Sequence, residues 1–441
     1  MRRTLFFAII ASLIFTACSK KADRKILTDQ NILHQNMKQL TEVIIQDMFS
    51  PPVSSRIYCY TSLAAYEAIK FDKPNYNSLT DQLNGFGAMP VPEKNKHYNF
   101  LLAATKAFFT VAEKITFSKD SLIQYENKIY PQFEALLDKE IYDRSISFGD
   151  SIGKTILKRA ANDNYKETRG MPKFLGSNEP GKWRPTPTDY LDALEPNWGM
   201  IKVLAVNSDQ AECPAPPAFS TDTTSEFFKY MKEVYYITTH LTDSQKTIAK
   251  YWDDNPFVIE HSGHLMFGNK KITPVGHWIG ITGIACNKTN ADAVKTAEAY
   301  ALTSVAMFDV INACWKVKYK YNHIRPVTVI NEFLDRNWQP FLQTPPFPEH
   351  SSGHSGISAS AATVLTKLFG DNFAFEDTSD LEYIGMKRSF KSFMQAANEA
   401  SISRVYGGIH YRTGVDAGAI QGREVGEYII NKFLKQSTEK N

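Results

Sequence analysis

The chain has 441 residues, of which 43% are hydrophobic and 22% charged, a balance typical of a globular protein and not of a disordered one. The net charge is only +3, so no nucleic-acid partner is expected from bulk charge. The five cysteines form no C-x-x-C pair, which argues against a zinc ribbon or a thioredoxin motif, and the standard nucleotide-binding loops are missing from the sequence.

The first 18 residues predict an export signal. Arg2 and Arg3 precede an apolar run that is too short to span a bilayer, and the run ends in small residues directly before Cys18. This pattern resembles a bacterial lipoprotein signal with Cys18 as the lipid-bearing residue; an ordinary secretory signal is the alternative. We therefore expect a lipid-anchored protein of the bacterial cell envelope, at the outer membrane or facing the periplasm. Its other cysteines would meet an oxidising compartment, and the sequence does not decide their pairing.

Apolar residues recur three and four positions apart through most of the chain, which predicts helices. The expected helices cover residues 33–49, 54–71, 97–114, 119–137, 141–164, 222–239, 291–314, 353–368, 380–404 and 415–434. Gly370 and the pair Gly407-Gly408 follow such runs, as C-capping glycines do. Alternating patterns typical of strands are scarce, so the sequence predicts an all-α fold.

The segment 165–220 is rich in Pro, Gly and Trp and predicts a long irregular connection. It divides the chain into an N-terminal helical half, residues 19–245, and a C-terminal helical bundle, residues 246–435, with a polar tail at 436–441. Long loops of this kind are often functional, so we expect the segment to shape the path of substrate to the site.

The first block with chemical potential joins Lys318 to Arg325-Pro326. Seven residues are almost two helical turns, so the two cations can share one face near the end of a helix. Pro326 disfavours helical geometry at Arg325, so the helix should stop there. Two cations on one face suit a tetrahedral oxyanion, although basic residues on helices are most often solvated surface.

The second block, Ser352-Gly353-His354, precedes a helix of small residues. The Ser352 side chain and the Gly353 N–H would lie at the helix N-terminus, where free N–H groups and the helix dipole attract anions. His354, in the first turn, can act as an acid or a base. The alternative is a serine N-cap beside an incidental histidine.

In the third block, Ser403-Arg404 is followed by Gly407-Gly408 and His410. On a continuous helix Arg404 and His410 would point to different faces, but the glycine pair breaks the helix, so both side chains can converge from a turn. The alternative is a glycine C-cap followed by a buried histidine.

Together, the order and spacing of the three blocks (K-x6-R-P, S-G-H, S-R-x5-H) resemble the signature of the type-2 phosphatidic acid phosphatase and vanadium-dependent haloperoxidase superfamily. The strict motif covers residues 318–410, and a looser similarity to bacterial haloperoxidase-type sequences extends to residues 252–254, 273–278 and 183–187. The resemblance implies two packed helical bundles, the C-terminal one holding an anion site and the N-terminal one covering it.

The resemblance also implies a role for each residue of the motif. His410 would be the axial group, as the vanadium ligand of a haloperoxidase or the phosphate-accepting nucleophile of a phosphatase. His354 would be the acid–base residue. The equatorial oxygens of vanadate or phosphate would be held by Lys318, Arg325, Arg404, Ser352 and the N–H of Gly353.

Two positions depart from the family pattern. Ser351 stands where the family usually has Pro, and Gly414 stands where it often has an Asp that orients the far ring nitrogen of the axial histidine. Asp416 is the nearest acid after His410, so either Asp416 or a backbone carbonyl is expected to take this role.

Chain length and the Trp-containing companion motifs favour the haloperoxidase branch, so we expect a vanadate enzyme that oxidises halide with hydrogen peroxide. Phe347 resembles chloroperoxidase-type sequences, because bromoperoxidase-type ones tend to carry a His there. His350 is either a second acid–base or halide-site residue or a partly exposed loop histidine. An envelope acid phosphatase that hydrolyses phosphate esters through a phosphohistidine is the alternative, because it would use the same core residues.

Two further classes are weaker. A non-enzymatic lipoprotein on a decayed fold should have lost core residues, and all of them are present. A zinc enzyme would use His261, His264 and either Asp253 or Asp254, but a His-x-x-His spacing is a weak signal by itself.

Overall fold

The computed structural model describes residues 24–207, 210–256, 259–262, 265–268 and 271–434, with no description of side chains between 257 and 270. The predicted signal with Cys18 and the polar tail at 436–441 lie outside the described residues. Within them, no helix is both long and apolar enough to cross a membrane.

Helices dominate the described chain, which confirms the predicted all-α class. After the short 3-10 helix η1 (Arg24–Leu27), the N-terminal half contains α2 (Asn31–Gln46), α3 (Pro51–Ile69), η2 (Lys70–Asp72), α4 (Phe100–Ile115), α5 (Lys119–Glu134), α6 (Lys139–Ala160), α7 (Tyr165–Arg169), η3 (Trp198–Met200), α8 (Glu226–Thr239) and α9 (Asp243–Tyr251). The C-terminal half contains α10 (Pro274–Thr289), α11 (Ala293–Tyr321), α12 (Pro326–Phe333), α13 (Gly353–Phe369), α14 (Leu381–Ile384), α15 (Phe393–Tyr406) and α16 (Arg412–Phe433).

Two short antiparallel hairpins interrupt the helices. Strand β1 (Ile259–Ser262) pairs with β2 (Leu265–Gly268), and β3 (Phe375–Asp377) pairs with β4 (Arg388–Phe390). The second hairpin corrects the continuous helix expected over residues 380–404. The chain there forms only the single turn α14, which ends at Gly385 in the left-handed region, and it then runs through β4 before α15 begins.

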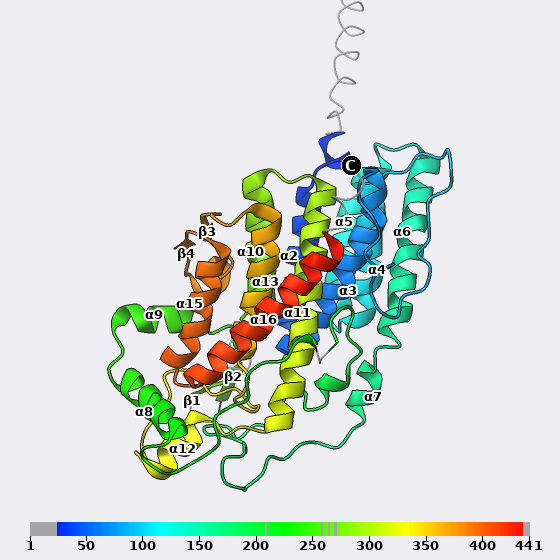
Figure 1. Cartoon of the computed structure of the whole chain (residues 1–441). Helices are drawn as coiled ribbons and strands as arrows, with labels where there is room; N and C mark the ends of the chain where they lie inside the picture. The colour runs from blue at the N-terminus through cyan, green and yellow to red at the C-terminus, as the bar shows by residue number, and fades with distance from the viewer. Residues whose placement is uncertain (1–23, 208–209, 257–258, 263–264, 269–270, 435–441) are drawn as a thin grey trace, which may run out of the picture.

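Helices α3 and α11 lie at the centre of the molecule (Figure 1). Every residue of α3 is buried, and so is nearly all of α11 as far as Trp315. Most side chains on every side of these helices are apolar or small, as is typical of helices surrounded by others. Helix α3 packs against α4 and α11, and α11 packs in turn against α13, so one hydrophobic core runs through both halves of the chain.

Local capping fixes where the central helices begin and end. Ser50 caps α3, with its hydroxyl accepting from the N–H of Val53, and Pro51 occupies the first helical position. Helix α11 continues seven residues beyond the expected end at 314 and stops at Asn322, which adopts a left-handed conformation. Lys318 therefore lies in the last turn of a buried helix.

The segment 165–220 carries the short helices α7 and η3 and packs along the C-terminal half. Its backbone pairs with the turn after α11 through Trp183 N–H to Asn322 O and Ile324 N–H to Gly181 O. Farther along, the Gln421 side chain of α16 donates to Ala211 O. The segment thus joins the two halves.

The four described cysteines, Cys59, Cys213, Cys286 and Cys314, are free thiols.

Candidate active site

The three sequence blocks meet where several C-terminal helices begin or end, on the lower side of the molecule in Figure 1. Lys318 lies in the last turn of α11, Arg325 directly precedes α12, and Arg404 lies in the last turn of α15. Ser352 caps α13, and His410 lies in the turn before α16. We call the set Lys318, Arg325, Ser352, Gly353, His354, Arg404 and His410 the cationic cup.

Both guanidinium groups of the cup are buried and keep donors free. Arg325 donates from Nε to Phe347 O at 2.9 Å and from Nη1 to Ile409 O at 2.7 Å. Arg404 donates from Nη1 to Trp252 O. Among the described residues, Arg325 Nη2 and Arg404 Nε have no hydrogen-bond partner although both atoms are buried. Burial and the neighbouring Arg404 charge lower the pKa of Arg325 to about 10, with Glu349 acting in the opposite direction.

Lys318 is fully buried beside these groups. Its Nζ donates to Pro348 O at 2.9 Å and to Glu349 O at 3.0 Å. The Phe347 ring lies 4.9 Å from Lys318 Nζ and 5.0 Å from the Arg325 guanidinium carbon, so it forms a cation–π wall of the cup. Burial lowers the pKa of Lys318 to about 8. Buried cations without carboxylate partners are costly, so this arrangement favours a bound anion.

The start of α13 supplies the neutral donors. The Ser352 hydroxyl oxygen accepts from the N–H of Ser355 at 3.3 Å and from its hydroxyl at 3.0 Å, which leaves the Ser352 proton available to a ligand. Gly353 is the first residue of the helix, where N–H groups have no intrahelical acceptor. A Cβ at Gly353 would lie in van der Waals contact with the Trp315 ring, 3.4 Å away.

His354 lies in the first turn of α13, and its Nε2 is buried without a partner among the described residues. Burial and then the charge of Arg404 hold the pKa of His354 well below its usual value, although the backbone of Asp253 acts in the opposite direction. The imidazole is therefore neutral near pH 7 and can accept a proton from a ligand in the cup.

His410 is also neutral. Burial and the charge of Arg325 hold its pKa well below the usual value, against the effect of Glu349. Its Nδ1 lies 2.7 Å from Glu349 Oε1, and its Nε2 lies 3.2 Å from Arg325 Nη1. A carboxylate can only accept from Nδ1–H and a guanidinium can only donate, so the Nε2 lone pair points to the cup.

Two expected supporting roles are corrected. Asp416 does not orient His410: it is exposed on α16, where the charges nearest to it are those of Arg412, Glu233 and Arg423. Glu349 is the partner of His410, and it lies three residues before the second sequence block. His350 is not a partly exposed loop residue. It is buried, with Nε2 2.8 Å from Pro214 O in the 165–220 segment.

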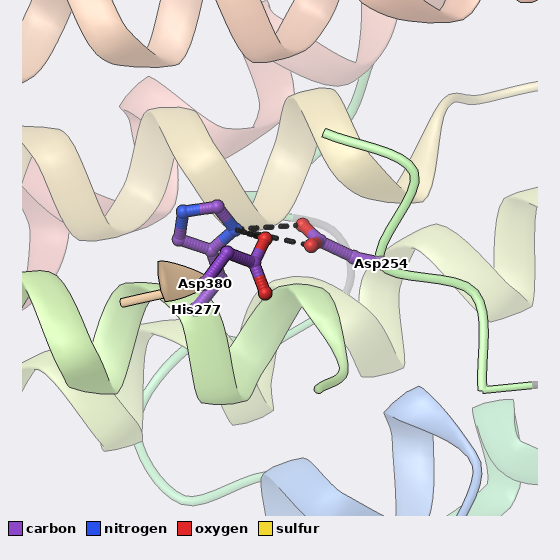
Figure 2. A group of neighbouring side chains, drawn as sticks. All are labelled: Asp254, His277 and Asp380. Carbon is purple, nitrogen blue, oxygen red and sulfur yellow. Dashed lines mark hydrogen bonds and ion pairs between the residues drawn. The ribbon is translucent and has the colours of Figure 1, made fainter. Parts of the chain in front are cut away.

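A second buried cluster lies behind the cup. His277 of α10 places Nδ1 3.1 Å from both oxygens of Asp254 and 3.5 Å from Asp380, and Figure 2 shows these two carboxylates around that nitrogen. Its Nε2 lies 2.9 Å from Asp377. Burial alone would lower the pKa of His277, but the three carboxylates hold it well above its usual value, so the ring is an imidazolium.

The imidazolium cluster anchors one wall of the cup. The His277 ring stacks on Trp252 with 4.4 Å between centroids, and the Trp252 carbonyl accepts from Arg404. The spacing of Asp254, His277 and Asp380 would also suit a metal ion, but both ring nitrogens face carboxylates as in an imidazolium. Of the zinc set weighed as an alternative, Asp254 faces His277 and Asp253 pairs with Lys271. The side chains of His261 and His264 lie outside the described residues.

Comparisons with known proteins agree with this geometry. A family model described as the VCPO second helical-bundle domain matches residues 298–439. A solved bacterial vanadium-dependent iodoperoxidase is 43% identical, and the match covers 91% of this chain and 96% of that one, with a TM-score of 0.87. None of the curated proteins matches the sequence.

Two solved forms of a bacterial vanadium-dependent chloroperoxidase, holo and apo, share the fold at 17% identity. Their TM-scores are 0.66 and 0.67, and the matches cover 89% and 88% of this chain and 94% and 95% of those chains. With the extent and identity of the iodoperoxidase match, the chain belongs to the vanadium-dependent haloperoxidase family. This result confirms the superfamily expected from the three sequence blocks.

Proposed function

We propose that this chain is a vanadium-dependent haloperoxidase that oxidises halide with hydrogen peroxide at a vanadate held by His410. The observation that carries the proposal is the cationic cup, in which buried donors of Arg325 and Arg404 and the buried Nε2 of His354 have no partner among the described residues. The neutral His410 directs a lone pair to the same place. This set of donors, together with the His410 nitrogen, suits a bound oxyanion.

The residues present fit vanadate. Lys318, Arg325 and Arg404 would neutralise its charge, Ser352 and the Gly353 N–H would donate hydrogen bonds to it, and His410 Nε2 would bind it. When bound, vanadate supplies a Lewis acid that activates peroxide. His354 Nε2 could accept a proton from a ligand in the cup and return it, because the ring is neutral and lies in the first turn of α13.

Iodide is the halide that the comparisons favour. The 43% identical relative is an iodoperoxidase, whereas the chloroperoxidases share only 17% identity. The phenylalanine at position 347 is a feature of chloroperoxidase-type sequences. Its ring lies against the Lys318 and Arg325 cations, so it forms a wall of the cup whichever halide is oxidised. We therefore expect a higher kcat/KM with iodide than with bromide or chloride.

The test uses the purified chain without its first 18 residues, loaded with orthovanadate. Halide oxidation is measured with hydrogen peroxide and each of the three halides, beside a phosphate-ester hydrolysis assay on the vanadate-free protein. We expect vanadate-dependent iodide oxidation that is lost in His410→Ala. Ester hydrolysis that is inhibited by vanadate, without any halide oxidation, would instead assign the cup to an acid phosphatase.

We propose further that Cys18 carries a lipid that holds the enzyme at the bacterial envelope. The proposal rests on the basic start, the short apolar run and the small residues before Cys18. Metabolic labelling with a fatty acid should mark the wild-type chain and not Cys18→Ala, and the variant should leave the membrane fraction. Equal labelling of both chains would contradict the anchor.

A further inference from the structure

The chain has no acid at position 414, although the ring of His410 requires a partner on its far side. Gly414 lies in the first turn of α16, and an ideal Cβ built there would lie 2.9 Å from Glu349 Cδ and closer still to Oε1. The Glu349 carboxylate thus occupies the space that a side chain at 414 would need.

Glu349 reaches this place from a different element, the loop before α13. Its Oε1 lies 2.7 Å from His410 Nδ1 and also accepts from the N–H of Tyr411 at 3.2 Å. Its Oε2 lies 3.2 Å from His323 Nδ1, and its own N–H donates to His323 O at 3.0 Å. The carboxylate is therefore fixed from both sides.

The same residue also positions a cation of the cup. The Glu349 carbonyl accepts from Lys318 Nζ at 3.0 Å, while its carboxylate binds His410. Glu349 is fully buried, and its two carboxylate oxygens face the two imidazoles of His410 and His323. A buried anion next to Nδ1–H keeps that proton in place and makes Nε2 a stronger electron donor.

We infer that Glu349 is the positioning residue of His410, that it replaces an acid on α16, and that Gly414 is required because Glu349 fills its space. The inference rests on the proposed function, in which His410 is the axial ligand. It predicts that positions 349 and 414 are interchangeable as a pair: the acid can move to 414 only if residue 349 becomes small.

The variants are Glu349→Ala, Glu349→Gln, Gly414→Asp and the double change Glu349→Ala with Gly414→Asp. Asp416→Asn is the matched control, because Asp416 is an exposed acid of the same helix. Vanadate affinity is measured by equilibrium dialysis of the whole chain. The tautomer of His410 is read by ¹⁵N NMR of the vanadate-free protein, with its signals identified from His410→Ala.

We expect Glu349→Ala to weaken vanadate binding by about 10-fold to 100-fold and to lose the pure Nδ1–H signal. The double variant should recover most of the vanadate affinity and most of the Nδ1–H signal. Glu349→Gln keeps the shape of the side chain but not its charge. This variant should retain the Nδ1–H tautomer of His410 but bind vanadate more weakly. Gly414→Asp alone should lower the melting temperature through its clash with Glu349, and Asp416→Asn should behave as wild type.

The inference would be overturned if both Glu349 variants kept the wild-type vanadate affinity and an unchanged Nδ1–H signal. It would also be overturned if the double variant folded but bound vanadate no more tightly than Glu349→Ala. If Glu349→Ala does not fold, Glu349→Gln and the double variant still decide the question. A wild-type chain that binds no vanadate would refute the proposed function instead, and the NMR measurement would still test the role of Glu349.

Discussion

Arg404 illustrates how a single buried cation can define a ligand. Its Nη1 is held by the Trp252 carbonyl, while Nε is buried and has no partner among the described residues. A lysine at this position would keep the charge, but it lacks the planar guanidinium that can donate hydrogen bonds to two oxygens at once. We predict that Arg404→Lys weakens vanadate binding at least about tenfold, since a hydrogen bond to a charged group contributes about 1.5–3 kcal/mol.

Equilibrium dialysis with vanadate measures this loss. The control is Arg144→Lys, because Arg144 lies on α6 and donates to the His97 carbonyl, away from the cup. Equal affinities for wild type and Arg404→Lys would show that Arg404 does not contact the anion.

His350 allows a prediction about pH. Burial lowers its pKa from 6.5 to about 4. The unfolded chain takes up a proton near pH 6.5 while the folded chain does not, so this residue contributes stability above that pH and the contribution is lost as the pH falls toward 4. We predict that protonation of His350 in the unfolded chain lowers the free energy of unfolding by up to about 3 kcal/mol between pH 6.5 and pH 4.

Urea unfolding of wild type and His350→Gln at several pH values measures the difference. The wild type should lose more stability than the variant between pH 6.5 and 4, and the two curves should run parallel above pH 7. Parallel curves over the whole range would mean that His350 titrates normally in the folded state.

The residues that the sequence could identify are those whose chemistry is fixed by local spacing. Lys318 and Arg325, or Ser352 and His354, lie on one helix end or one turn, so their proximity follows from backbone geometry. The role of Glu349 could not be predicted in this way, because its partner His410 lies 61 residues away in the sequence. A missing acid at Gly414 was the signal, but only the tertiary structure shows that an acid from another loop fills the place.

At the scale of elements, α16 packs on α13 through a row of glycines spaced four residues apart. The glycines after Gly414 in this row are Gly418, Gly422 and Gly426, and a Cβ at any of them would overlap α13. At Gly422 it would lie 2.8 Å from Ala359 Cβ and closer to the Gly356 carbonyl. The two helices can therefore approach only with glycine at these positions, and this approach sets the distance between His410 and Ser352.

We predict that Gly422→Ala lowers the free energy of unfolding by about 1–3 kcal/mol, because overpacking of a backbone contact forces the helices apart. Thermal unfolding measures the effect, and Gly87→Ala is the control, since a Cβ at Gly87 would meet nothing within 4 Å. Unchanged stability in Gly422→Ala would show that α16 can shift without cost.

Helical periodicity predicted most of the long helices, including the fully buried α3, but it missed some helices and the very short strands. Helices α9, α10 and α12 were not expected. Helix α10 is buried on most sides and lacks a polar stripe, and α12 has only eight residues. The hairpin of β3 and β4 has three residues in each strand, too few for alternation to be distinguished from a helical pattern.

At the scale of the whole molecule, one hydrophobic core runs through both helical halves of the chain. Helix α3 of the N-terminal half packs on α11, whose last turn carries Lys318. The 165–220 segment adds backbone hydrogen bonds to the turn that holds His323 and Arg325. The N-terminal half therefore supports the helix and the turn from which two cations of the cup project.

We predict that a fragment of residues 246–441 cannot keep the cup, although it contains every cup residue and the region matched by the family model. Removal of the first 245 residues exposes the face of α11 that α3 covers, and exposed apolar surface of that size favours aggregation. Expression of the fragment beside the whole chain tests this, with solubility, thermal unfolding and vanadate affinity as readouts. A soluble fragment with full vanadate affinity would show that the C-terminal bundle is an independent domain and that the N-terminal half serves only to cover it.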